Sequence, residues 1–199
     1  AEKRGFVWIG SSTEGLMRFD NYLPRRYSSH DKGEHALPGN NIAQIAEDSL
    51  GQIWVLTNKG LARYRPETDD FYVPKQPSEP GGGNLIVHCA SPVAGGMLFG
   101  SQNQIFRYDY ADDEIRLLLT FRREDPYPIH ALYTLENGNF LCFNRWHGLL
   151  EVDPRSRETR QPAFRGNKEN TSILVDSQGR VWLSPYNRGI ECFDPEGRR

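Results

Sequence analysis

The chain has 199 residues, of which 12% are aromatic, and a formal net charge of −2. Such a charge does not suit a surface that binds nucleic-acid phosphates. No apolar run of about 18 residues and no charged leader before an apolar core occurs, so we expect neither a membrane span nor a signal peptide.

A short phrase of glycine followed by an apolar run recurs along the chain. It begins at Gly5, Gly51, Gly95, Gly138 and Gly179, so that successive copies lie 46, 44, 43 and 41 residues apart. A second apolar and aromatic phrase follows each copy nine or ten residues later and begins at Gly15, Gly60, Gln104, Gly148 and Gly189. Repeats of about this length, built from short apolar runs, are typical of β-propeller blades.

One period contains four short runs with strand character. In the second period these are residues 42–46, 53–56, 61–64 and 71–73, which are rich in β-branched and aromatic side chains. Turns rich in Gly, Asn and Asp separate them. No segment sustains a long 3.6-residue apolar period, so we expect almost no helix.

The repeats divide the chain into five blades of an all-β propeller. Counted blade by blade, the runs predict 18 strands, with three strands in the first and last blades and four in each of the others. The innermost strands should begin near Ile42, Leu85, Ile129 and Ser172, and Trp8, Trp54 and Trp182 should be buried at equivalent places between sheets. The predicted blades are a partial one at 1–37, whole ones at 38–80, 81–125 and 126–166, and a partial one at 167–199. This count predicts an open arc, an incomplete part of a ring of about seven blades.

The three cysteines fall in predicted strands of three different blades. Cys89, Cys142 and Cys192 occupy first, second and third strand positions, respectively. An odd number at such scattered positions argues against a disulfide framework and favours small buried apolar side chains.

Two loops between second and third strands stand apart as a candidate ligand site. Such loops share one face of a propeller with the connections between blades, and that face is the usual binding surface. An exposed aromatic ring offers a flat face to a sugar, and Arg, His and Asn offer hydrogen bonds or a charge. The candidate residues are Arg145, Trp146, His147, Tyr186, Asn187 and Arg188. The alternative is that Trp146 and Tyr186 pack against neighbouring blades and the cations are solvated.

Other polar clusters carry weaker signals. His30, Asp31, Glu34 and His35 are possible metal ligands, but they lie in a surface connection without a scaffold, so we expect no metal site and no cofactor. The acid pairs at 69–70 and 112–114 lie at predicted turns, where Asp suits the backbone geometry, so no catalytic dyad is expected.

The recurring phrases resemble the two-component regulator propeller repeat, whose pattern is close to G-x-hydrophobic-W-hydrophobic-G-T-x-x-G-L-x-R-aromatic-D. The second repeat adds residues 37–42 and 45–51, which are similar to the family's L-P-x-N-x-I and I-x-E-D-x-x-G. Leu98 and Leu141 depart from the pattern where it has Trp, and Gln104 where it has Gly. The resemblance implies a periplasmic sensor region of a hybrid two-component histidine kinase of Bacteroides-type bacteria, with a glycan fragment as input.

Three functions follow as hypotheses. The first is a non-catalytic sensor propeller that binds an oligosaccharide and contacts neighbouring propeller or sandwich domains of its parent protein, with self-association through uncovered sheets. The second is a lyase resembling streptogramin or polysaccharide lyases, in which His147 with Glu14 or Glu124 would be the base. The spacing fixes no such pair, which disfavours an enzyme. The third is a purely structural interaction propeller.

Overall fold

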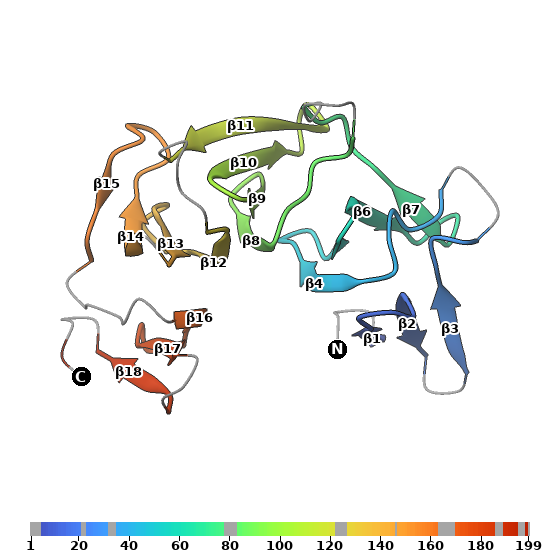
Figure 1. Cartoon of the computed structure of the whole chain (residues 1–199), viewed down its shortest axis with the longest axis horizontal. Helices are drawn as coiled ribbons and strands as arrows, with labels where there is room; N and C mark the ends of the chain where they lie inside the picture. Colours follow the sequence, from blue (N-terminus) through green and yellow to red (C-terminus); the bar gives the residue numbers. More distant parts are fainter. Residues whose placement is uncertain are drawn as a thin grey trace.

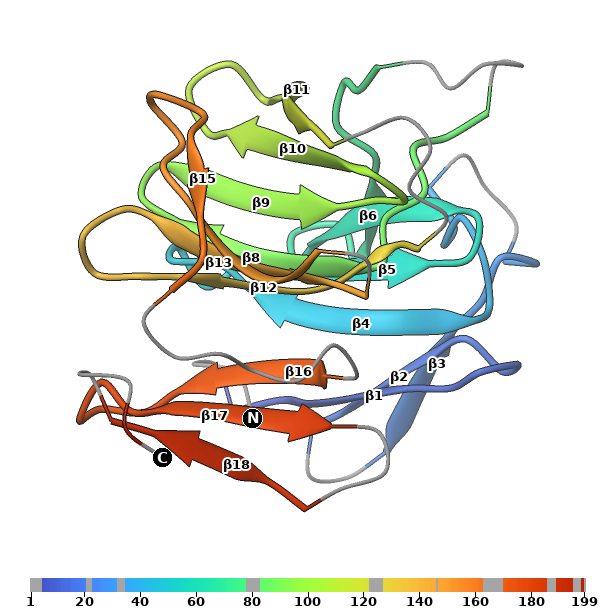
Figure 2. The same ribbon diagram turned by 60° about the vertical axis from the view of Figure 1, so that its left-hand side comes forward.

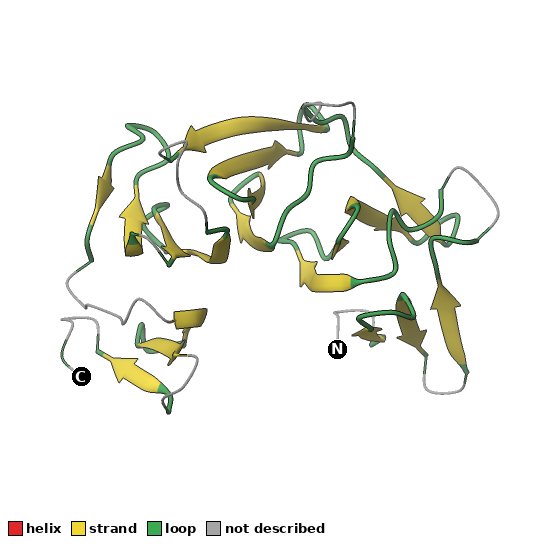
Figure 3. Ribbon diagram, in the orientation of Figure 1, coloured by secondary structure: helices red, strands yellow, loops and turns green. Residues whose placement is uncertain are grey.

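The computed structural model describes residues 5–20, 23–31, 35–77, 83–121, 127–145, 147–162, 170–185, 189–194 and 198. These residues form eighteen strands and no helix, as Figure 3 shows. Accordingly, no membrane-spanning helix occurs in the described parts of the chain. The predicted number of strands and the all-β class are confirmed.

The strands form five antiparallel sheets, one for each predicted blade. Blade 1 consists of β1 (Val7–Gly10), β2 (Leu16–Phe19) and β3 (Pro24–Tyr27). Blade 2 consists of β4 (Ile42–Glu47), β5 (Ile53–Thr57), β6 (Gly60–Arg65) and β7 (Asp70–Tyr72). Blade 3 consists of β8 (Cys89–Val93), β9 (Gly96–Gly100), β10 (Gln104–Asp109) and β11 (Glu114–Thr120). Blade 4 consists of β12 (Ile129–Thr134), β13 (Phe140–Asn144), β14 (Gly148–Val152) and β15 (Thr159–Arg160). Blade 5 consists of β16 (Asn170–Val175), β17 (Val181–Pro185) and β18 (Glu191–Phe193).

The five blades follow one another around a common axis as an open arc (Figure 1). β4, β8, β12 and β16 are innermost, and each contacts the next. Figure 2, turned by 60°, shows the sheets of blades 2 to 4 stacked face to face. The arc is open between blades 5 and 1, as expected from blades of three strands at both ends.

Two predicted strand starts differ from the structure. β8 begins at Cys89, four residues after the predicted Leu85, because its partner β9 ends at Gly100, which pairs with Cys89. Leu85 and Val87 are nevertheless fully buried, so this connection contributes to the core without ladder pairing. β16 begins at Asn170 rather than Ser172, with a register shift between these two residues.

The tryptophans occupy equivalent strand positions but are buried unequally. Trp54 is fully buried between blades 2 and 3, where its ring contacts Phe99 and Tyr108 at centroid distances of 5.2 and 4.7 Å. Trp8 and Trp182 are only half-buried, so the prediction that all three are buried was wrong for these two. Trp182 lies on the outer face of blade 5, where the described residues place no further sheet against it.

An aspartate six residues before the tryptophan fixes the indole in two blades. Trp54 Nε1 donates to Asp48 Oδ2, and Trp182 Nε1 donates to Asp176 Oδ2, each at 2.9 Å. In blade 4, Leu135 and Leu141 occupy these two positions within the same turn, in which Leu135 N donates to Asn139 O. In blade 3 the hairpin is tighter, and Leu98 replaces the tryptophan. Aspartate and tryptophan therefore occur together or are both absent in the four blades that have a first strand.

A polar cluster joins blades 1 and 2, and a second joins blades 2 and 3. In the first cluster Asp69 accepts hydrogen bonds from Tyr27 and Tyr64 at 2.6 and 2.7 Å, and it pairs with Arg18 and Arg25 at 2.8 and 2.7 Å. In the second cluster Asp113 accepts from Tyr72 and Tyr108, each at 2.7 Å, and lies 3.5 Å from Arg63. Both aspartates have a positive φ, of 56° and 51°, as turn aspartates tolerate. We call these the first and second Arg–Asp–Tyr clusters.

At the next interface, the described residues form no such cluster. Arg157 occupies the turn position equivalent to Asp113, with a φ of 62°, and Arg107 is equivalent to Arg63. Arg107 instead donates to Ala94 O of its own blade at 2.9 Å. Blades 3 and 4 are joined by an apolar core of Leu98, Ile105, Ile129, Phe140 and neighbouring side chains.

Candidate functional site on the propeller axis

A polar cavity of about 360 Å³ lies between the innermost strands of blades 2 to 5. Its lining residues come from β4, β8, β12 and β16 and from the residue before β8. They are Ala43, Gln44, His88, Cys89, Ala90, His130, Ala131, Leu132, Ser172 and Ile173. The sheets converge on this space, so rigid strands and not loops hold its walls.

Two histidines face the cavity because of irregular register at the start of the inner strands. In β12 the ladder shifts between Ile129 and Ala131, and His130 is the residue left over. In β4 the same shift lies between Ile42 and Gln44, and the equivalent residue is Ala43. His88 holds this position ahead of β8, where its backbone N–H donates to Gly100 O at 2.7 Å. A bulge re-aims a side chain toward the sheet edge, here the axis.

A glutamine side chain braces one wall of the cavity. Gln44 Oε1 accepts from Ala90 N at 2.7 Å, and Gln44 Nε2 donates to Ala90 O at 3.3 Å. This bidentate contact connects blade 2 to blade 3 and fixes the spacing of their inner strands beside His88.

Both axial imidazoles are biased toward the neutral form. Burial, followed by the nearby charge of Arg145, lowers the pKa of His130. Burial and the charge of His130 lower the pKa of His88. At neutral pH each ring therefore offers one hydrogen-bond donor and one acceptor.

Of the six predicted ligand-binding residues, the structure describes Arg145 and His147. The exposed Arg145 lies over the ring of Tyr127, with its guanidinium carbon 5.2 Å from the ring centroid. His147 is half-buried and lies 5.7 Å from the Phe121 ring, and its backbone N–H donates to Asn144 Oδ1. Arg145 directly follows Asn144, which pairs with Ile129 at the start of β12, so it lies at that end of the axial cavity. Trp146, Tyr186, Asn187 and Arg188 lie outside the described residues.

The sequence analysis missed His88, His130 and Gln44. A signal was available, because the two histidines occupy the position of Ala43 when the first strands of successive blades are aligned. The predicted loops drew attention to the same face of the propeller, but the strand residues beneath them line the cavity.

The acidic pairs have structural partners. Asp69 and Asp113 belong to the Arg–Asp–Tyr clusters, and Asp70 forms a bidentate pair with Arg65 at 2.7 and 2.8 Å. Asp112 and Glu114 both bind Arg116. Glu14, nominated as partner of a catalytic base, binds Arg26, and Glu124 lies outside the described residues.

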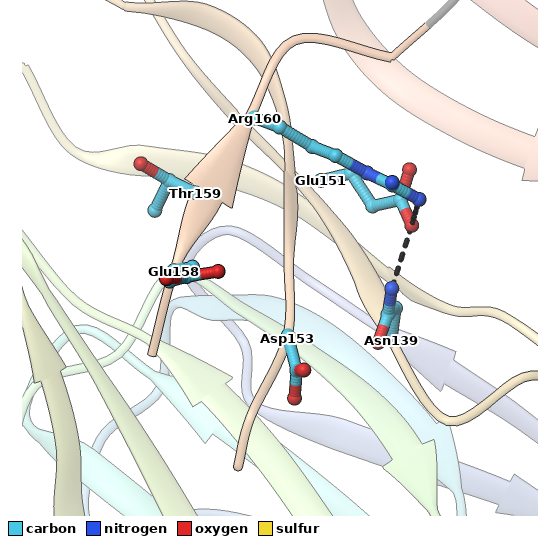
Figure 4. Close-up of a pocket in the computed structure, with 6 residues that line it drawn as sticks. All are labelled: Asn139, Glu151, Asp153, Glu158, Thr159 and Arg160. Carbon is cyan, nitrogen blue, oxygen red and sulfur yellow. Dashed lines mark hydrogen bonds and ion pairs between the residues drawn. The ribbon is translucent and has the colours of Figure 1, made fainter. Parts of the chain in front are cut away.

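A second polar cavity, of about 420 Å³, lies at the outer edge of blade 4. In Figure 4, Asn139 and Arg160 both point to Glu151, and each donates to its Oε1 at 2.7 Å. Arg160 in particular holds the pKa of Glu151 below its ordinary value, so this carboxylate is ionised and occupied. The cluster therefore connects β15 to β14, and its carboxylate Glu151 is not a protonated acid that could serve in catalysis.

No group of three potential metal ligands occurs among the described residues. His30, Asp31 and His35 are described, whereas residues 32–34 of the same connection are not. The three cysteines are free thiols, two of them buried. Burial raises the pKa of the Cys89 thiol, so it lines the cavity as a neutral group.

Antiparallel sheets arranged around a polar axial cavity define a propeller built from sequence repeats. Residues 36–59 match the family described as two component regulator propeller, which confirms the resemblance seen in the repeats. No curated protein matches the sequence.

Solved structures share this fold. The extracellular domain described as that of a hybrid two component system of B. thetaiotaomicron is 21% identical, with a TM-score of 0.78 over 94% of this chain. A second such domain from that organism is 16% identical, with a TM-score of 0.74 over 96% of this chain. This chain spans about a quarter of each, 25% and 26%. Virginiamycin B lyase from Staphylococcus aureus is 13% identical, with a TM-score of 0.66 over 97% of this chain and 67% of the lyase.

Proposed function

We propose that this chain is part of the ligand-sensing propeller region of a two-component signalling receptor and acts outside the inner membrane, in the periplasm. The observation that carries the proposal is the match of residues 36–59 to the two component regulator propeller family. The fold shared with extracellular domains of hybrid two component systems supports it. Histidine kinase activity would belong to other parts of such a receptor.

The ligand proposed is a glycan fragment bound at the axial end where Arg145 lies. The ring of Tyr127 offers a flat face for a sugar, and Arg145 and His147 offer polar groups beside it. Trp146, Tyr186, Asn187 and Arg188 are residue types that would add a stacking ring and further hydrogen bonds. A rigid set of inner strands beneath variable loops is the usual arrangement of a propeller binding face.

A glycan array followed by calorimetry on the protein tests this proposal. Trp146→Ala should weaken binding of the best glycan by about 1–3 kcal/mol through loss of a stacking surface. Arg155→Ala changes an exposed arginine on the outer turn of blade 4 and is the matched control, which should bind as the wild type does. No glycan binding, or equal binding by the Trp146 variant, would contradict the assignment.

The same samples test the two other functions. Because the fold resembles that of virginiamycin B lyase, a streptogramin is a suitable test compound for a lyase assay, and we expect no turnover. His147 packs against Phe121 and Glu14 binds Arg26, so these two residues have structural partners and do not act as a base with its assistant. A protein that neither binds glycans nor turns over a substrate would instead be an interaction propeller.

A further inference from the structure

We propose that the axial cavity recognises a carboxylate group of the ligand and that His88 and His130 take up protons as this anion binds. The inference rests on the ligand-sensing function proposed above and narrows the ligand to an acidic sugar or another small carboxylic acid. Each proton comes from water or buffer and binds an imidazole nitrogen, and no covalent bond to the ligand forms.

The first step of the argument is the shared position of the two histidines. They occupy the same place in consecutive repeats, and both line one cavity of about 360 Å³. A space of this size is within the range of small-ligand sites and accepts one or two sugar rings. The other lining residues include Ala43, Ala90 and Ile173, of which Ala90 and Ile173 also pack into the cores between blades.

The second step is the sign of the charges around the cavity. Besides burial, the charge of Arg145 lowers the pKa of His130, and the charge of His130 lowers the pKa of His88. Each charge therefore opposes protonation of the neighbouring ring. The described lining residues include no carboxylate, and Cys89 remains a neutral thiol. Within the described part of the chain, the site therefore gathers cationic or potentially cationic groups, and its lining residues supply no anion to compensate them.

The third step is the effect of an anion placed there. An opposite charge within about 4–6 Å favours the charged form of a histidine, so a carboxylate reverses the bias toward neutral rings. The charged imidazolium then donates a charge-assisted hydrogen bond, which is roughly twice as strong as a neutral one. Because the rings are neutral beforehand, binding of the anion must be coupled to proton uptake.

Calorimetry with digalacturonic acid and its methyl ester tests the inference, because the two probes differ in charge and little in shape. We expect the acid to bind about tenfold more tightly at pH 5.5 than at pH 7.5, and the ester to bind equally at both. Titration of the acid in two buffers of different ionisation enthalpy should show proton uptake by the wild-type protein, a result that depends on no variant.

Variants locate the protons. His88→Gln and His130→Gln keep a hydrogen-bonding side chain but cannot become charged, so each should lose part of the pH dependence and proton uptake, and the double variant should lose both. His30→Gln, in the connection between blades 1 and 2, is the matched control and should behave as the wild type. Thermal unfolding of each variant confirms that it is folded.

Several outcomes overturn the inference: no binding of the acid, equal pH dependence of acid and ester, or full proton uptake by a folded His88→Gln, His130→Gln double variant. Binding of neutral glycans without preference for the acid would leave the sensor function in place and remove only this inference. If the chain binds the acid with proton uptake but its parent receptor does not respond to the acid, the carboxylate inference stands and the sensor function is contradicted.

Discussion

At the scale of single residues, the pairing of Asp48 with Trp54 explains how a tryptophan is tolerated between two sheets. The indole N–H is buried, and an unpaired buried donor costs about 1–3 kcal/mol. Asp48 meets this need and also accepts from the backbone N–H groups of Leu50 and Gln52. Leu135 and Leu141 of blade 4 show the other solution, in which both polar groups are removed.

We expect the two residues to be energetically coupled. Asp48→Leu alone should destabilise the protein by about 2 kcal/mol or more, because the indole N–H loses its acceptor inside the core. The Asp48→Leu, Trp54→Leu double variant, which copies blade 4, should be less destabilised than the sum of the single variants by about 1–2 kcal/mol. Urea unfolding of the four proteins measures this coupling, and strict additivity would show that the aspartate acts only on the turn.

At the scale of the blades, the interfaces are of two kinds. The first two carry an Arg–Asp–Tyr cluster beside their apolar core, and the third is apolar, with Arg107 and Arg157 at the equivalent positions. In each cluster, a tyrosine from the outermost strand of one blade and a tyrosine from the third strand of the next thus share a single aspartate across the interface. This use of the turn aspartate depends on the contact between blades, since the turn itself forms equally well with Arg157.

Asp69→Asn isolates the contribution of the first cluster. Asparagine tolerates the positive φ of this position, so the substitution removes charge and leaves the turn. We expect a loss of about 2 kcal/mol in the free energy of unfolding, because hydrogen bonds to a charged group are stronger than neutral ones. Asp112→Asn, which changes an exposed ion pair in blade 3, is the control and should cost less than about 1 kcal/mol. Equal effects would mean that the cluster adds nothing to an ordinary surface pair.

The same cluster predicts how stability depends on pH. Burial raises the pKa of Asp69, but hydrogen bonds from Tyr27 and Tyr64 and the charges of Arg18 and Arg25 outweigh it, so the pKa lies below the ordinary 3.8. The unfolded chain therefore binds the proton more readily, and this stabilisation, present above pH 3.8, is lost as the pH falls further. Asp69→Asn should flatten the acid limb of a plot of unfolding free energy against pH.

At alkaline pH, the free energy of unfolding depends on pH with the opposite sign. Burial, together with the hydrogen bond to Asp69, raises the pKa of Tyr64 from 10.0 to about 12. The folded protein thus retains this proton over that range, and stability falls as the pH rises from 10.0 toward 12. Tyr64→Phe should remove part of this fall, as monitored by circular dichroism.

At the scale of the whole molecule, the two ends of the arc expose apolar sheet faces. On blade 1, Val7 and Ile9 are each 43% exposed, and they pair across the sheet with Phe19 and Met17. On blade 5, Leu174 is 60% exposed and pairs with the half-buried Trp182. Blade 1 exposes the face that each of the other blades packs against the preceding blade, and blade 5 exposes the face that each of the other blades packs against the following blade. The two exposed faces are therefore of the kinds that pack together inside the arc.

We therefore expect the isolated chain to self-associate end to end. Light scattering at rising protein concentration should show dimers or larger species, because extended apolar faces are rarely left in water. Leu174→Lys should shift the equilibrium toward monomer by placing a charge in the contact. Leu50→Lys, at a 62% exposed turn position away from both faces, is the control. A wild-type monomer at high concentration would contradict this expectation.

The sequence predicted the fold well because each strand is a short apolar run bounded by a turn, and the repeats align these runs with one another. It misplaced the start of β8, because the buried residues Leu85 and Val87 lie beyond the end of their partner strand. The residues that line the axial cavity were not predicted. Loop residues are conspicuous in composition, whereas His88 and His130 acquire their meaning only when the sheets are placed around an axis. The Arg–Asp–Tyr clusters were hidden for the same reason, since turn aspartates have a sufficient local explanation.

Because the interfaces between blades differ, we expect the blades to open locally in a particular order along the arc. Each blade is held only by its neighbours, so local opening spreads from one blade to the next. As far as its residues are described, blade 5 has one covered face and no Arg–Asp–Tyr cluster, whereas blade 2 is covered on both faces and takes part in both clusters. Amide hydrogen exchange should therefore be fastest in β16 to β18 and slowest in β5 and β6, so that the protection of each blade records its place in the arc.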